Sequence, residues 1–66
     1  MTPELFTQIT GYELLDQNTT LNGYTEYKIM TKDSFYQIFN KIDDAYEKCD
    51  KKFHVEIHDN DVLIYL

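Results

Sequence analysis

The chain has 66 residues, with 12 acidic side chains, six lysines and no arginine, so its net charge is −6. Nucleic acid would repel such a surface, because binding to phosphates depends on lysine and arginine, whereas proteins that bind nucleic acid would be attracted to it. Cys49 is the single cysteine, which excludes an intrachain disulfide and leaves self-association as the expected support for so small a core.

The N-terminal residues carry no sign of a targeting segment. Met1 to Glu4 lacks the basic region of a signal peptide, and no stretch approaches the roughly 18 apolar residues that span a bilayer. We therefore expect a single soluble domain, residues 1–66, in the cytoplasm and without a membrane partner. Leu5, Phe6 and Ile9 predict a short amphipathic turn or arm.

Two strands and a tight turn are predicted next. Residues 12–15 read as a first strand, and Asn22-Gly23 is a strong signal for a hairpin turn because both residues tolerate positive φ. Residues 24–30 are rich in aromatic and β-branched side chains and predict a second strand. Alternation places Tyr27 and Ile29 on one face of that strand, opposite the polar side chains.

A long amphipathic helix follows. Thr31 is the predicted N-cap, and Asp33 would lie in the first turn, where a negative charge opposes the helix dipole. Apolar residues then recur at steps of three and four, as expected for one helical stripe: Phe35, Ile38, Phe39, Ile42, Ala45, Tyr46 and Cys49. Acidic residues occupy the other faces: Asp43, Asp44, Glu47 and Asp50.

The remaining residues predict one or two further strands. Phe53, Val55 and Ile57 alternate with polar residues, Asp59-Asn60-Asp61 marks a bulge or tight turn, and residues 62–66 continue as a short strand. The predicted fold is α+β, a three- to four-stranded largely antiparallel sheet with one amphipathic helix packed on it, ordered ββαβ or ββαββ.

No constellation of residues predicts catalysis. His54, Glu56 and His58 could present two imidazoles and a carboxylate to a metal, but a polar outer strand face explains them more simply, since no remote further ligand stands out. Cys49 lies on the apolar stripe, and Ser34 lies in the first turn of the predicted helix. We therefore expect no catalytic residue, metal or cofactor.

The aromatic side chains point instead to a protein-binding surface. Six tyrosines and four phenylalanines are more than one thin core can hide, and Tyr36 lies off the helical stripe. Exposed aromatic residues bordered by acid are typical of protein interfaces. The alternatives remain that several tyrosines lie at the margin of the core and that the acidic charge serves solubility alone.

One stretch resembles a known family. Tyr24-Thr25-Glu26-Tyr27-Lys28, followed by Asp33-Ser34-Phe35 and Ile38-Phe39, is similar to the small uracil-DNA glycosylase inhibitors encoded by phi-type podophages of Bacillus. Their pattern is a Tyr-x-Glu-Tyr strand, a Ser/Asp-Phe helix start, an acidic stretch and a closing strand. Residues 53–63 can be laid on that closing strand without a gap, so the resemblance covers about two thirds of the chain.

The resemblance implies a homodimer that mimics DNA and occupies the DNA-binding cleft of the host uracil-DNA glycosylase. An apolar pocket at the dimer interface would take up the leucine that the enzyme inserts into the duplex when it flips out a uracil. The implied partner-binding residues are Glu26, Asp33, Phe35, Tyr36, Phe39 and Asp43. The implied dimer interface consists of Phe35, Phe39, Ile42 and Tyr46.

Two positions depart from the family pattern. Tyr36 replaces an acid that follows the helix-start Phe, and Phe39 replaces a tyrosine one turn later. The missing anionic and hydroxyl contacts must come from elsewhere, for which Asp33 and Asp43 are the candidates. Two other functions stay open: inhibition of a different nucleic-acid enzyme, such as a nuclease, and a structural or regulatory dimer without mimicry.

Overall fold

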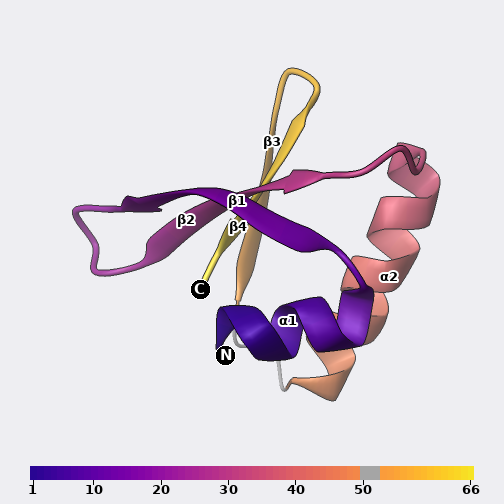
Figure 1. The fold of residues 1–66 in the computed structure, drawn as a ribbon, viewed down its shortest axis with the longest axis horizontal. Helices are drawn as coiled ribbons and strands as arrows, with labels where there is room; N and C mark the ends of the chain where they lie inside the picture. Colours follow the sequence, from indigo (N-terminus) through magenta and orange to yellow (C-terminus); the bar gives the residue numbers. More distant parts are fainter. Residues whose placement is uncertain (50–52) are drawn as a thin grey trace.

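The computed structural model describes residues 1–49 and 53–66, and it contains one antiparallel sheet and two helices (Figure 1). Its elements are α1 (Pro3–Thr10), β1 (Glu13–Thr19), β2 (Thr25–Met30), α2 (Phe35–Lys48), β3 (His54–His58) and β4 (Asp61–Tyr65). The sheet order is β1-β2-β4-β3. The α+β class is confirmed in its four-stranded form, with an additional helix before the first strand. The expectation for Asp50 lies outside the described residues.

Two hairpins build the sheet and join at its centre. The β1–β2 turn contains the predicted Asn22-Gly23, and Gly23 takes a φ of +83°, which a residue without a Cβ adopts readily. The β3–β4 turn lies at Asp59 and Asn60. β2 pairs with β4, so β1 and β3 form the two edges. Figure 1 shows the two hairpins strongly rotated against each other, as the twist of antiparallel strands requires.

The N-terminal arm is a complete helix. The Thr2 hydroxyl accepts a hydrogen bond from the Leu5 N–H at 3.2 Å, Pro3 occupies the first turn, and Gly11 ends α1 at a φ of +77°. Ser or Thr before a helix, Pro at its start and Gly after its end are strong boundary signals. They make α1 a two-turn helix rather than a turn, with Phe6 fully buried.

Helix α2 begins three residues later than predicted from Thr31. Ser34 is the N-cap: its hydroxyl accepts a hydrogen bond from the Gln37 N–H at 3.3 Å, while the Gln37 side chain accepts one from the Ser34 N–H at 2.9 Å. This capping box satisfies two backbone donors at once, which Thr31 could not do. Thr31 instead accepts from the Asp33 N–H in the preceding loop. Asp33 therefore lies outside the helix.

One face of the sheet, the inner face, carries the core. Ile29 of β2 and Val62 and Ile64 of β4 join the buried residues of both helices and Phe53 in one cluster. On the opposite, outer face, the residues paired between β2, β4 and β3 are all polar or aromatic except Leu63. Glu26, Tyr65 and His54 form one row across three strands, and Lys28, Leu63 and Glu56 form the next. Among the described residues, no helix is long and apolar enough to cross a membrane.

Candidate partner-binding surface

Aromatic side chains line the start of α2. Phe35, the first residue of the helix, is 42% exposed, and its ring stacks on that of Phe39 with the centroids 6.2 Å apart. Tyr36 is 78% exposed, which confirms that it lies off the buried stripe. Large aromatic side chains exposed together on one helix turn are uncommon on a surface that contacts only water.

A groove continues from these aromatics along α2 and beside the edge strand β3. It has a volume of about 410 Å³, and we call it the α2–β3 groove. Its lining residues are Phe39, Ile42, Asp43, Tyr46, Phe53, His54, Val55 and Ile57. The floor is ordered by an edge-to-face contact between Tyr46 and Phe53, whose ring centroids are 5.1 Å apart. At the rim, Ile57 is 49% exposed and Asp43 is exposed.

The structure brings four of the predicted site residues together in this groove, namely Phe39, Ile42, Asp43 and Tyr46. Phe35 adjoins them through its stacking on Phe39. Ile42 is only 4% exposed, so it packs in the core of the single chain and reaches the groove only at its floor. The β3 side of the groove was not among the predicted site residues. The alternation that placed Ile57 on an apolar strand face was its only signal.

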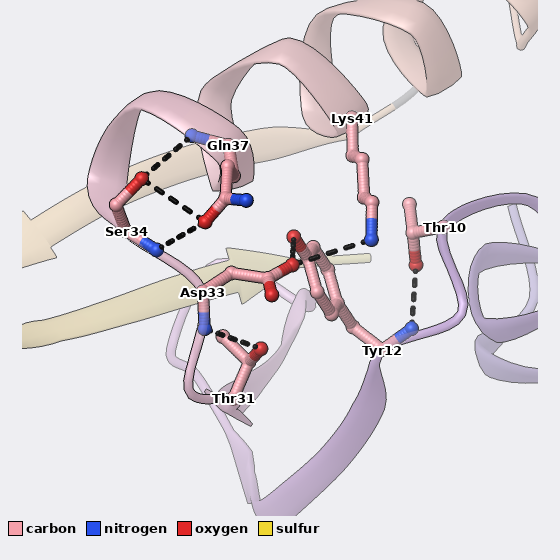
Figure 2. A network of polar contacts seen from close by, with 7 residues as sticks. All are labelled: Thr10, Tyr12, Thr31, Asp33, Ser34, Gln37 and Lys41. Carbon is pink, nitrogen blue, oxygen red and sulfur yellow. Dashed lines mark hydrogen bonds and ion pairs between the residues drawn. The ribbon is translucent and has the colours of Figure 1, made fainter.

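Asp33 is held in a polar network that joins three segments of the chain (Figure 2). The Tyr12 hydroxyl donates to Asp33 Oδ2 at 2.7 Å, and Lys41 Nζ donates to the same oxygen at 3.2 Å. Lys41 Nζ also lies 4.9 Å from the centre of the Tyr12 ring. The hydrogen bond from Tyr12, then that from Lys41, holds the pKa of Asp33 below its usual range. The negative charge of Asp33 is therefore balanced by Lys41, and the carboxylate serves to hold the fold together.

Replacing Tyr12 by phenylalanine tests this network. We expect the free energy of unfolding at neutral pH to fall by about 1 kcal/mol, the typical net contribution of one hydrogen bond. Chemical denaturation measures it. Tyr36→Phe, which removes an exposed hydroxyl, is the matched control and should retain wild-type stability. Equal stability of Tyr12→Phe and wild type would contradict the structural role of Asp33.

The pH dependence follows from the same contacts. Burial, followed by the hydrogen bond to Asp33, raises the pKa of Tyr12 from 10.0 to about 12. The folded state therefore keeps this proton longer than the unfolded state, so the contribution of Tyr12 is complete below pH 10 and is lost as the pH rises through 12. Asp33 acts in the opposite sense, with its contribution lost as the pH falls through its lowered pKa. Tyr12→Phe should reduce the alkaline loss of stability between pH 10 and 12.

Glu26 lies apart from the groove, on the outer face of the sheet. Its carboxylate accepts a hydrogen bond from the Tyr65 hydroxyl at 2.8 Å. That bond, followed by burial, raises the pKa of Tyr65 to about 12. The predicted partner-binding residues are thus divided between two surfaces, with Glu26 on the outer face and Phe39 and Asp43 in the α2–β3 groove.

The two histidines of β3 bracket Glu56. His58 Nε2 lies 2.9 Å from Glu56 Oε1, and His54 Nε2 lies 3.1 Å from Glu56 Oε2. The His58 contact is the largest cause that lowers the pKa of Glu56. Within residues 1–49 and 53–66, no group of three or more His, Cys, Asp or Glu residues is arranged to hold a metal ion. The geometry describes a polar strand face in which the carboxylate satisfies both imidazoles.

Comparisons with protein-family models, with curated proteins and with solved structures found no match for this chain. The function must therefore be inferred from the two surfaces and from the resemblance of residues 24–39. Both surfaces offer aromatic and acidic side chains, which suit a protein partner.

Proposed function

We propose that this chain is a homodimeric inhibitor of a bacterial uracil-DNA glycosylase and acts by occupying the enzyme's DNA-binding cleft. The observation that carries the proposal is the exposed aromatic start of α2, which opens into the α2–β3 groove. Phe39 lines that groove and Phe35 stacks on its ring, so an inserted leucine side chain would find apolar walls there. The resemblance assigns the same role to the helix-start phenylalanine.

Dimer formation is supported by what a single chain leaves uncovered. Within residues 1–49 and 53–66, β3 pairs only with β4, so its other edge offers backbone N–H and C=O groups to a further strand or helix. Ile57 of β3 and Phe35 of α2 are each more than two fifths exposed. A second copy would cover this apolar rim, because oligomerisation is one way in which a small protein enlarges its core and most homo-oligomers are symmetric.

Acidic charge supports the mimicry of DNA. The chain carries a net charge of −6, and a cleft that binds phosphates presents the complementary sign. The family has an acid at the position of Tyr36, and Asp43, exposed at the rim of the groove, is the better candidate to replace its charge. The carboxylate of Asp33 already accepts hydrogen bonds from Tyr12 and Lys41. Glu26 would act from the outer face as a second, separate charge. The inhibitor requires no cofactor and would work in the host cytoplasm.

The dimer is tested by sedimentation. At micromolar concentration and moderate salt, we expect a mass near twice the 7.9 kDa of one chain. Introduction of a negative charge in the groove through Ile57→Asp should shift the population toward monomer, because a buried unpaired carboxylate is strongly unfavourable. Glu47→Gln, an exposed change on α2, is the control. A wild-type monomer at these concentrations would exclude the shared pocket.

Inhibition is tested with purified enzyme. A tenfold excess of the protein should abolish uracil excision from an oligonucleotide. The protein should also displace DNA from the enzyme, so that no complex of enzyme, DNA and inhibitor forms. Uracil excision at the uninhibited rate would exclude this target. In that case, retention of a nuclease or another nucleic-acid enzyme on the immobilised protein would support the alternative of mimicry aimed elsewhere. A dimer that retains no such enzyme would support a structural role.

A further inference from the structure

A second hollow lies on the outer face of the sheet. It has a volume of about 400 Å³, and we call it the hairpin pocket. Its lining residues are Thr20, Asn22, Tyr24, His54, Glu56 and Tyr65. The pocket shares only His54 with the α2–β3 groove. It is built from the β1–β2 turn on one side and from β3 and β4 on the other.

Local hydrogen bonds fix the turn that forms one wall. The Thr20 hydroxyl donates to the Tyr24 carbonyl at 3.0 Å and accepts from the Tyr24 N–H at 3.1 Å, and the Thr20 N–H donates to the same carbonyl at 2.8 Å. Reciprocal backbone bonds between Thr25 and Leu66, at 2.9 and 3.0 Å, tie the end of the turn to the residue after β4. The pocket walls are therefore preformed.

The chemistry of the pocket favours a cation. Glu56 supplies a carboxylate, whose pKa the hydrogen bonds from His58 and then His54 hold below the usual range. The hydroxyl of the neighbouring Tyr65 donates to a second carboxylate, Glu26. Lys28, which projects from the same face, pairs with Asp61 at 3.3 Å. The 52% exposed ring of Tyr24 adds an aromatic wall. A carboxylate beside aromatic rings suits a flat, weakly hydrated cation better than a compact ammonium ion.

We propose that the hairpin pocket binds the guanidinium group of an arginine side chain on the partner protein. Each oxygen of Glu56 has a second lone pair, so the carboxylate can accept hydrogen bonds from the guanidinium while it keeps its contacts with His54 and His58. Tyr24 provides a ring for stacking. This inference rests on the proposed function, because a DNA-binding cleft supplies cationic side chains, and it adds an anchor on the sheet face opposite the leucine pocket.

The test uses the whole ¹⁵N-labelled chain and N-acetyl-arginine amide as the probe. Titration should shift the backbone amides of the β1–β2 turn, β3 and the end of β4, whereas N-acetyl-citrulline amide, the uncharged isostere, should leave them in place. Glu56→Gln should weaken arginine binding about tenfold or more, as expected for loss of a charge-assisted hydrogen bond. Glu47→Gln, which removes the same charge from α2, should bind like wild type.

Three results would overturn the pocket: no shift with arginine, equal shifts with citrulline, or equal arginine affinity of Glu56→Gln and wild type. The enzyme assay separates this failure from failure of the proposed function. If wild type inhibited the glycosylase fully but did not bind arginine, the proposed arginine site would be wrong and the proposed function would still hold. If the protein bound arginine but did not inhibit the glycosylase, the arginine site would hold and the glycosylase would not be the target.

Discussion

Replacing Phe6 by alanine is expected to lower the free energy of unfolding by about 3 to 5 kcal/mol, the usual loss for a large aromatic residue in a core. The side chain is 0% exposed, and its ring meets that of Phe53 edge to face with the centroids 5.5 Å apart. Small domains have a total stability of only about 5 kcal/mol or somewhat more. Phe6→Ala would therefore keep only about 0 to 2 kcal/mol, so that up to about half of its molecules would be unfolded at room temperature.

Urea denaturation followed by circular dichroism measures this loss. Leu5→Ala is the matched control, since Leu5 is the neighbouring residue of α1 and is 42% exposed; it should change stability by less than about 1 kcal/mol. If Phe6→Ala unfolded at nearly the wild-type urea concentration, α1 would be an appendage rather than part of the core.

The second large effect concerns inhibition. Phe35→Ala should weaken binding to the glycosylase by about 2 kcal/mol, roughly thirtyfold, as is common for an aromatic residue at the centre of an interface. The substitution removes the ring that stacks on Phe39, a lining residue of the α2–β3 groove. Leu21→Ala, at the fully exposed tip of the β1–β2 turn, is the control for loss of an exposed apolar side chain. Binding is measured by surface plasmon resonance.

Circular dichroism and sedimentation must first show that Phe35→Ala keeps its fold and its dimer. Glu26→Gln gives the contrasting result, because removal of a charge on the outer face should slow association and reduce its salt dependence while dissociation changes less. If Phe35→Ala bound as tightly as wild type, mimicry could stand but the leucine pocket could not.

Most of the fold followed from local patterns in the sequence. The alternation of residues 24–30, the Asn22-Gly23 turn and the apolar stripe of α2 each specify one element without reference to the rest of the chain. The errors arose where two local signals competed. Thr31 and Ser34 are both good N-caps, and only Ser34 has Gln37 at the position that completes a capping box. For α1, Thr2, Pro3 and Gly11 mark both ends of a helix, although the segment between them is short.

The candidate site could be predicted only in part, because its residues meet across the fold. Phe39, Asp43 and Tyr46 lie on adjoining turns of α2, so helical spacing alone brings them together. The partner of Asp33 is Tyr12, 21 residues earlier in the chain, and no local pattern contains that pairing. The resemblance implies that Glu26 and Asp33 both bind the partner, whereas the alternation of β2 places Glu26 on the outer face.

The position of β4 between β2 and β3 has a consequence for the order of folding. Each hairpin is local in sequence and can form within microseconds, but their junction brings together residues such as Glu26 and Tyr65, which are 39 positions apart. Closing that loop around α2 has an entropic cost before any contact is gained. The β2–β4 seam should therefore govern the folding rate, and a nascent chain would hold two separate hairpins until the seam closes.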